Sequence, residues 1–217
     1  MKRDDPGRGR FITLEGGEGV GKSTNVGFVS SRLEAAGVDV QLTREPGGTP
    51  LAERVRQVIV SPSGEMVPPI AELLLIFAAR SLHVEGLIRP ALEAGRWVLC
   101  DRFTDASYAY QGWGRELGDA PVAWLENHVQ GDLRPDLTLL LDADPAIGLE
   151  RAGARGAADR FEQERLEFFG RVREGYLARA AAEPDRFRVV DASRPLREVQ
   201  QKLRDYINEF LQANGKI

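Results

Sequence analysis

Three things that the sequence lacks narrow the classes to which this protein can belong. Its 217 residues contain one cysteine, Cys100, so no intramolecular disulfide bond can form, which fits a reducing compartment. No stretch approaches the roughly 18 consecutive apolar residues of a transmembrane helix. There is no basic excess either, since the net charge is -4, and this argues against a surface that coats nucleic acid. We therefore expect neither a membrane nor a nucleic acid among its partners.

The N-terminus carries no recognisable targeting segment. Met1–Arg10 is polar and charged, contains glycine and proline, and lacks the apolar stretch of a signal peptide. We expect residues 1–9 to form a disordered arm and the protein to be cytoplasmic. Residues 10–217 are long enough to bury a substantial core, and no repeat or linker divides them, which predicts a single domain.

Short runs of β-branched and aliphatic residues alternate with helical patterns along the chain. Four of the five runs are mostly continuous rather than alternating, as expected for parallel strands that are covered on both faces. Strands separated by helices predict an α/β fold of three layers, with a five-stranded parallel sheet flanked by helices. The predicted strands are Phe11–Leu14, Val38–Thr43, Trp97–Cys100, Leu137–Leu141 and Phe187–Val190.

Three segments have the apolar periodicity of helices. Ile70–Arg80 is apolar nearly all round, so we expect it to be buried or to form a contact between subunits. A short apolar stripe consists of Leu51, Val55, Val58 and Ile59. The clearest stripe lies near the C-terminus and consists of Leu196, Val199, Leu203, Tyr206, Ile207 and Phe210.

The strongest signal is the glycine-rich loop from Gly16 to Ser23, a full match to G-x-x-x-x-G-K-S. It follows the first predicted strand and opens a helix, which is the context that this motif needs. Its backbone N–H groups can surround a polyphosphate, and the helix N-terminus adds positive charge. The alternative, a glycine-rich turn that binds nothing, fits this context poorly. The residues expected to bind ATP are Gly16, Gly17, Glu18, Gly19, Val20, Gly21, Lys22, Ser23 and Thr24, of which Lys22 is also expected to be catalytic.

Two residues are candidates to hold Mg²⁺. Ser23 supplies the hydroxyl of the loop motif, and Asp101 follows the apolar run Trp97–Cys100. A carboxylate at the carboxyl end of a parallel strand faces the crevice in which ligands bind. The alternative is that Asp101 is an exposed residue that caps the following turn. Asp142 has a similar position, and its alternative is to cap the next helix.

A glycine-rich loop does not by itself separate kinases from regulatory GTPases. The chain contains no N-K-x-D motif to read guanine and no D-x-x-G segment downstream of Lys22. A transfer enzyme needs cations for two bound anions, and arginine grips phosphate through parallel hydrogen bonds. Arg44 and Arg102 stand at the ends of predicted strands, whereas a solvated surface charge is the better interpretation of an arbitrary arginine. Further candidates are Arg80, Arg151, Arg155 and Arg160.

Together these motifs resemble the thymidylate kinase family, over a stretch from about Phe11 to about Leu211. One departure is Ala106, where the family's signature usually has serine, so one hydroxyl is missing. Thr43-Arg44-Glu45-Pro46-Gly47-Gly48-Thr49 resembles the family's acceptor-phosphate loop, and Asp101-Arg102-Phe103 followed by Ser107-Tyr108-Ala109-Tyr110-Gln111-Gly112 resembles its signature. Arg134-Pro135-Asp136-Leu137-Thr138 and Asp159-Arg160 resemble the segments before the fourth strand and inside the lid.

The resemblance implies an activity and an assembly. ATP would transfer its γ-phosphoryl group to dTMP, giving dTDP and ADP for dTTP synthesis. Another P-loop (deoxy)nucleoside monophosphate kinase and a P-loop nucleotide-binding switch protein remain as alternatives. The fold would be that of the P-loop nucleoside monophosphate kinases, with a mobile lid over about residues 151–161. The family suggests a homodimer through apolar helices such as Ile70–Arg80.

The resemblance also implies roles for single residues. Glu18 would accept a hydrogen bond from the 3′-hydroxyl of dTMP, while Arg44 and Arg102 would bind its phosphate, Arg102 also being catalytic. Phe77 would stack on thymine, although the apolar pattern alone favours a core position. Tyr110 would pack against the 2′ carbon of the sugar, with core packing as its alternative. The other residues expected at the base are Arg80, Ser107 and Gln111.

The expected catalytic cations include the lid. Some members of the family carry an arginine in the loop directly after the acidic residue, where this chain has Gly19. The resemblance implies that a basic lid compensates, which makes Arg151, Arg155 and Arg160 catalytic candidates, with a solvated basic lid as the alternative. No general base is required, because a phosphate monoester has a second pKa of about 6 and is already ionised. His83 and His128 form no ligand pattern and are interpreted as structural.

Overall fold

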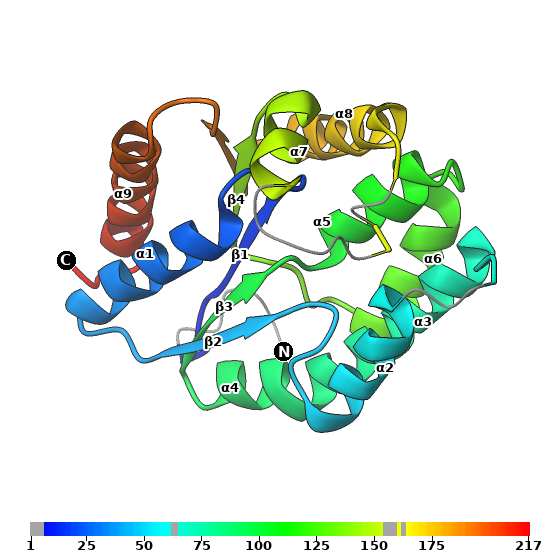
Figure 1. Ribbon diagram of the computed structural model, residues 1–217. Coiled ribbons are helices and arrows are strands. Elements are labelled where there is room, and N and C mark those ends of the chain that lie inside the picture. Colours follow the sequence, from blue (N-terminus) through cyan, green and yellow to red (C-terminus); the bar gives the residue numbers. More distant parts are fainter. Residues whose placement is uncertain (1–6, 62–64, 154–159, 162–163) are drawn as a thin grey trace.

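The computed structural model describes residues 7–61, 65–153, 160–161 and 164–217. Its centre is a parallel sheet of five strands in the order β2-β3-β1-β4-β5 (Figure 1). All five predicted strands are confirmed, and each continues one or two residues beyond the carboxyl end of its apolar run. The strands are β1 (Phe11–Gly16), β2 (Val40–Arg44), β3 (Trp97–Asp101), β4 (Leu137–Asp142) and β5 (Phe187–Asp191).

Helices cover both faces of this sheet, as the three-layer prediction requires (Figure 1). The helices are α1 (Lys22–Ala35), α2 (Pro50–Val60), α3 (Pro69–His83), α4 (Arg89–Glu93), α5 (Thr104–Ser107), α6 (Asp119–Gln130), α7 (Pro145–Gly153), α8 (Leu166–Ala182) and α9 (Leu196–Ala213). Two π-helical segments, η1 (Val84–Ile88) and η2 (Tyr108–Gly114), continue α3 and α5.

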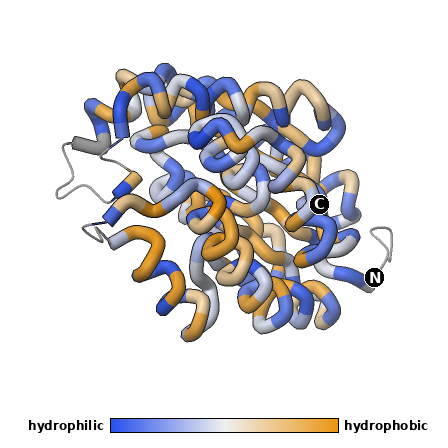
Figure 2. Tube along the Cα trace, turned by 90° about the vertical axis from the view of Figure 1, so that its right-hand side faces the viewer, coloured by the Kyte–Doolittle hydropathy of each residue, from blue (hydrophilic) through white to orange (hydrophobic). Residues whose placement is uncertain are grey.

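Successive residues of a strand contribute to different cores, because their side chains point to opposite faces. Ile12 of β1 packs in the core beneath α1 and α9, whereas Phe11 packs in the core around α4 and η1. In β4, Leu139 belongs to the α1 and α9 side and Leu140 to the α8 side. Both faces therefore need apolar residues, which explains why the runs are continuous. Figure 2 shows apolar segments passing through the middle of the molecule.

The expected disordered arm over residues 1–9 is wrong for residues 7–9. Arg8 is buried and its Nη1 lies 2.8 Å from Oδ2 of Asp136. The backbone N–H of Gly9 donates to the carbonyl of Leu92 at 2.9 Å. A buried ion pair cannot be read from a short polar segment, because the partner lies far along the chain. Residues 1–6 lie outside the described residues.

The three helical stripes are covered to different degrees. In α9 the stripe is buried at Val199, Leu203 and Ile207. In α2, by contrast, Leu51 and Val58 are 50% and 61% exposed. Helix α3 is buried on one side and exposed on another, where Ile70 and Leu74 are 47% and 52% exposed.

The predicted lid over residues 151–161 is only partly described. Helix α7 continues to Gly153, and Arg160 and Phe161 are described, but residues 154–159 lie outside the described residues. Within the described part of the chain, no helix has the length and apolar character needed to cross a bilayer.

A buried ion-pair network joins α5 to the start of β5, and it predicts the cost of removing Arg186. This side chain is 4% exposed, and its Nη1 and Nη2 donate to the two carboxylate oxygens of Asp105 at 2.7 and 2.8 Å. Arg186→Met should lower the free energy of unfolding by about 3–5 kcal/mol, because Asp105 loses a partner in a buried site. Urea denaturation measures this change.

The matched control is Arg194→Met. Arg194 forms a surface pair with Asp191 at 3.2 Å and its side chain is 65% exposed, so its removal should cost less than about 1 kcal/mol. If the free energy of unfolding fell equally in the two variants, the buried network would not stabilise the fold more than a surface ion pair does.

Candidate active site

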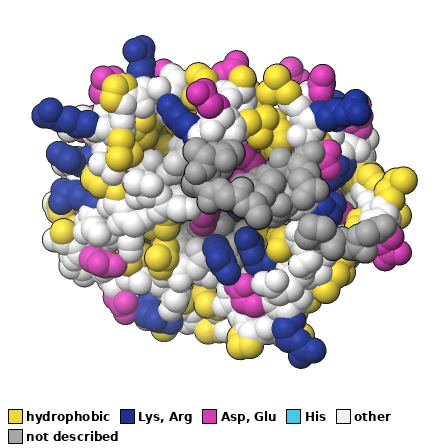
Figure 3. Space-filling model, in the orientation of Figure 1, with side chains coloured by type: hydrophobic (Ala, Val, Ile, Leu, Met, Phe, Trp, Pro, Cys, Tyr) yellow, Lys and Arg dark blue, Asp and Glu magenta, His cyan; other side chains and the backbone are white. Residues whose placement is uncertain are grey.

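A cleft of about 330 Å³ opens where β1, β2 and β3 end. The register pairs Arg44 with Asp101 across β2 and β3, which brings the two predicted strand-end residues to one edge. On the face seen in Figure 3, Lys or Arg side chains lie beside Asp or Glu side chains near the middle. The predicted site residues that line the cleft are Glu18, Gly19, Gly21, Lys22, Ser23, Arg44, Arg80, Asp101, Arg102, Ser107, Tyr110 and Gln111.

The glycine-rich loop holds Lys22 at the edge of this cleft. Its Nζ donates to the carbonyls of Gly16 and Gly17 at 3.1 and 2.6 Å. Gly19 has φ 68°, and a Cβ there would lie 1.7 Å from the carbonyl oxygen of Gly148. Only glycine therefore fits, because α7 packs directly against the loop. Gly16, Gly17 and Val20 line a second, much smaller cavity, while Thr24 is exposed and lines neither.

The ammonium group of Lys22 is poorly compensated. Burial, and next the Arg102 guanidinium, lower the pKa of Lys22 to about 8. An anion beside Nζ would stabilise the charged form and raise this pKa again. The loop is thus prepared for a polyanion.

Asp101 and Ser23 both line the cleft, which fits the residue types expected at a magnesium site. Oδ1 of Asp101 is buried and has no hydrogen-bond partner among the described residues. An unpaired buried carboxylate oxygen needs a cation or a water. The described part of the chain holds no cluster of three or more His, Cys, Asp or Glu side chains that would form a metal site of protein ligands alone. A magnesium ion here would depend on phosphate oxygens and water as well.

Arg102 stands at the centre of the site in a left-handed conformation, with φ 68°. Its N–H donates to the carbonyl of Leu14 at 3.0 Å, which ties it to β1. Its Nη2 lies 2.6 Å from Oε1 of Glu18, and its guanidinium lies 4.7 Å from the centre of the Tyr110 ring. The Tyr110 hydroxyl donates to the same oxygen of Glu18 at 2.7 Å. One carboxylate oxygen therefore organises both side chains.

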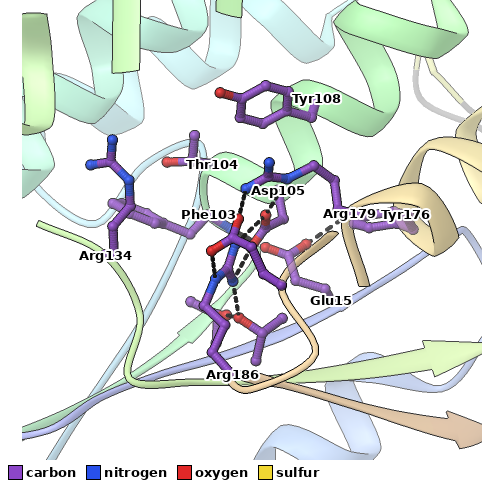
Figure 4. A network of polar contacts seen from close by, with 12 residues as sticks. Glu15, Phe103, Thr104, Asp105, Tyr108, Arg134, Tyr176, Arg179 and Arg186 are labelled. Atoms are coloured by element: carbon purple, nitrogen blue, oxygen red, sulfur yellow. Dashed lines mark hydrogen bonds and ion pairs between the residues drawn. The ribbon is translucent and has the colours of Figure 1, made fainter. Parts of the chain in front are cut away.

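Glu15, which was not among the predicted site residues, supports Arg102 from behind. Glu15 is fully buried and accepts from the N–H of Phe103 at 2.7 Å and from the hydroxyl of Tyr176 at 2.9 Å (Figure 4). The Tyr176 hydroxyl in turn accepts from Nη1 of Arg102 at 3.2 Å. Burial, and next the charge of Asp105, raise the pKa of Glu15 to about 8. No local pattern identifies this residue, since it lies inside an apolar strand.

Another part of the cleft wall is built around Arg80, which is 2% exposed. Its Nε donates to Glu45 at 2.7 Å, and its Nη2 donates to Ser107 Oγ at 3.0 Å and to the carbonyl of Phe103 at 3.2 Å. Its Nη1 is buried without a hydrogen-bond partner among the described residues. Arg80 thus carries one donor that is unused within the protein.

The predicted stacking role of Phe77 is wrong in this structure. Phe77 is 2% exposed and packs in a core cluster with Leu73, Tyr108 and Val122. It lies behind the guanidinium of Arg80, 4.5 Å from the ring centre, and does not line the cleft. The preceding residue, Ile76, lines the cleft instead. Adjacent helical residues point about 100° apart, so the choice between them depends on how α3 is rotated.

The four remaining predicted arginines are spread out. Arg44 lines the cleft and its Nη2 lies 3.0 Å from Glu53. Arg151 is not brought to the cleft, because α7 carries it to the turn after β5, where its Nη1 donates to the carbonyl of Ala192 at 2.9 Å. Arg160 lies at the end of α2 and Arg155 lies outside the described residues.

His83 has the structural role expected of it. It is fully buried, with Nδ1 3.0 Å from Glu45 Oε1 and Nε2 2.7 Å from Thr43 Oγ1. It thereby fixes the carboxylate that holds Arg80. Other cleft residues were missed because they lie on helical stripes or in loops whose orientation the sequence does not reveal: Arg56, Ile59, Val60, Ile76, Phe103 and Phe161.

Comparison with known proteins agrees with this geometry. Residues 14–203 match the family model described as Thymidylate kinase. The chain is 59% identical over 204 residues to the thymidylate kinase of Pseudomonas fluorescens (strain Pf-5), covering 94% of this chain and 97% of that protein. It is 57% identical over 202 residues to the thymidylate kinase of Alcanivorax borkumensis, covering 93% and 97% of the two chains.

A solved structure has the same fold. The crystal structure of thymidylate kinase from Ehrlichia chaffeensis superimposes with a TM-score of 0.74 at 32% sequence identity. The alignment covers 93% of this chain and 99% of that one.

The raised pKa of Glu15 predicts how stability depends on pH. Its carboxyl group has a pKa of about 8 in the folded protein against 4.5 as its ordinary value. Between these values the unfolded chain releases the proton first, so this group lowers the free energy of unfolding as the pH rises. The side chain of the Glu15→Gln variant cannot ionise. Between about pH 5 and about pH 8, the free energy of unfolding of this variant should therefore fall by about 3 kcal/mol less than that of the wild type.

Urea denaturation at the two pH values measures this difference. Glu126→Gln is the control, because Glu126 is also a buried carboxylate bound to a tyrosine hydroxyl, that of Tyr108 at 2.7 Å. Parallel pH curves for the wild type and Glu15→Gln would show that Glu15 is ionised in the folded protein.

Proposed function

This chain belongs to the thymidylate kinase family, and from that premise we propose that its cleft holds dTMP between Arg102 at the phosphate and Arg80 at the base. The protein phosphorylates dTMP to dTDP with ATP as co-substrate. The observation that carries the proposed arrangement is that Lys22, Glu18 and Arg102 line the same cleft as Arg80 and Gln111.

The acceptor phosphate is proposed to bind Arg102 and Arg44. Both line the cleft at the ends of their strands, and Arg102 is fixed by its backbone bond to Leu14. A planar guanidinium suits two phosphate oxygens at once. Glu18 is proposed to accept from the 3′-hydroxyl of the sugar, in support of which its carboxylate lies beside Arg102. A sugar held there links the acceptor to the loop that holds ATP.

The donor is proposed to lie along the glycine-rich loop. Lys22 would turn its ammonium group from the carbonyls of Gly16 and Gly17 toward the β- and γ-phosphates. Asp101 and Ser23 would hold Mg²⁺, and the unpaired buried oxygen of Asp101 supports this. Magnesium, when bound, neutralises phosphate charge.

Catalysis would come from alignment and charge rather than from a general base. The acceptor oxygen is already ionised, because the second pKa of a phosphate monoester is about 6. Lys22 and Arg102 would stabilise charge on the transferring group. Arg155 and Arg160 stay proposed as lid cations, since Gly19 leaves the loop without an arginine. The lid would also exclude water from the reaction.

The walls of the cleft suggest how sugar and base are selected. Tyr110 lines the cleft with its hydroxyl bound to Glu18, which supports a position of its ring against the 2′ carbon. A 2′-hydroxyl would meet this ring without a good partner. Ile76 supplies an apolar wall, and Ser107 and Gln111 lie at the base end with Arg80.

We also propose a homodimer and a single kinase domain from residue 7 to residue 217. Helix α3 carries the exposed apolar residues Ile70 and Leu74, and both α2 and α6 pack against this helix. Exposed apolar residues on neighbouring helices favour a partner surface of the same kind. The use of ATP agrees with the expected cytoplasmic location. The neighbouring helices α2 and α6 also carry exposed apolar residues, namely Leu51, Val58 and Trp124.

Lys22→Ala tests the proposed use of the loop. Turnover of dTMP should fall by roughly 10³-fold or more, because a contact to the transferring phosphoryl group is worth several kcal/mol. A coupled assay of ADP release with ATP and Mg²⁺ measures it, run across all nucleoside monophosphates. Lys202→Ala, an exposed lysine on α9, is the control. Near-normal turnover in Lys22→Ala would refute the role of Lys22.

Leu74→Arg tests the proposed dimer. A charge on the exposed side of α3 should convert a dimer into a monomer of 23.9 kDa, measured by size-exclusion chromatography with light scattering. Leu196→Arg is the control, since Leu196 is equally exposed, at 50%, but lies on α9. A dimer that survives Leu74→Arg would show that the subunits meet elsewhere.

A further inference from the structure

Glu72 is a buried carboxylate to which the proposed mechanism gives no role. It lies in the first turn of α3 and is 1% exposed. Its Oε1 accepts from Nε2 of Gln111 at 2.8 Å and from Nε of Arg115 at 3.2 Å. Its Oε2 lies 2.7 Å from Nη1 of Arg160 and 3.2 Å from Nη2 of Arg115. Three donor side chains thus converge on one buried acid.

The bond to Glu72 fixes the orientation of the Gln111 amide. A carboxylate between two guanidinium groups can only accept hydrogen bonds. The amide of Gln111 must therefore turn its NH₂ group toward Glu72. Its carbonyl oxygen has no hydrogen-bond partner among the described residues, and Gln111 lines the cleft. At this position Gln111 therefore presents a hydrogen-bond acceptor to the cleft, not a donor.

Arg80 offers the complementary group nearby. Its Nη1 is a buried donor without a hydrogen-bond partner among the described residues, and its Nη2 is bound to Ser107, four residues before Gln111. A donor from Arg80 and an acceptor from Gln111 match an imide, in which a carbonyl oxygen stands beside an N–H group. Thymine and uracil have this edge. Cytosine has an amino group and an unprotonated ring nitrogen there, which reverses both positions.

We propose that Glu72 is a positioning residue that locks the Gln111 amide and thereby makes the kinase reject cytosine nucleotides. The inference rests on the proposed placement of the base between Arg80 and Gln111. If position 72 held a group able to donate, the amide could rotate and present its NH₂ to the ring nitrogen of cytosine. The buried charge of Glu72, held by Arg115 and Arg160, prevents this rotation.

Glu72→Gln tests the proposal, because glutamine keeps the shape and can donate to Gln111. The measurement is kcat/KM for dTMP, dUMP and dCMP. The ratio of dTMP to dCMP should fall about ten-fold or more, through a gain in relative activity on dCMP. The ratio of dTMP to dUMP should not change, because the two bases share the same imide edge. Arg80 still disfavours cytosine, so part of the discrimination should persist.

Two further variants separate positioning from packing. Glu72→Asp keeps a group that only accepts and should retain most of the discrimination. Glu126→Gln, a buried carboxylate bound to Tyr108 and Arg134, should leave both ratios unchanged. Should Glu72→Gln not fold, Gln111→Met removes the amide, and the dTMP to dCMP ratio must then fall as well.

Different outcomes test the role of Glu72 and the placement of the base between Arg80 and Gln111. If activity on all three nucleotides falls together in Glu72→Gln and the ratios hold, Glu72 is structural and the proposal is overturned. The proposal is also overturned if Glu72→Asp loses as much discrimination as Glu72→Gln. If the wild type itself phosphorylates dCMP as well as dTMP, the placement of the base between Arg80 and Gln111 is wrong.

Discussion

The arrangement of the site depends on how Arg102 is held in a left-handed conformation at the end of β3. Such a conformation costs a residue with a side chain about 1–2 kcal/mol, so the surroundings must enforce it. Leu14 binds its N–H, and Glu15 binds the N–H of the next residue, Phe103. The guanidinium is then shared between Tyr176 and Glu18. Because β1 supplies Leu14, Glu15 and the start of the glycine-rich loop, the same strand sets the positions of the loop and of Arg102.

The charges of the cleft are already engaged within the protein. Lys22 donates to two loop carbonyls, Arg102 to Glu18 and Arg44 to Glu53. Lys22 and Arg102 are largely buried, and a buried charge without a partner is costly, so the protein supplies temporary acceptors for them. On binding, phosphate groups would therefore replace the contacts that these cations make within the protein. Such exchange favours ligands whose geometry matches several cations at once, which is a source of selectivity rather than of raw affinity.

Two predicted residues show where inference from the sequence fails. Phe77 was the aromatic candidate at the base, yet it is Ile76 that lines the cleft, because α3 is rotated so that the ring packs against Leu73 and Val122. Arg151 belongs to the expected basic lid, yet it binds the carbonyl of Ala192 beyond β5. In both cases the residue type was suitable. The helix that carries Phe77 was predicted correctly, whereas Arg151 was expected in the lid and lies in α7. The direction of the side chain was decided by the neighbours of the helix.

The amino-acid sequence by itself determined the five strands, their parallel arrangement, the glycine-rich loop and the strand-end residues Asp101 and Arg102. These features follow from local patterns: apolar runs need cover on both faces, and a glycine-rich loop between a strand and a helix is the context that its motif requires. Only the tertiary structure decided that Glu15 and Glu72 support the site. Both are carboxylates inside apolar segments, and nothing nearby in the chain explains them. Their partners Tyr176 and Gln111 lie 161 and 39 residues away, and packing alone brings each pair together.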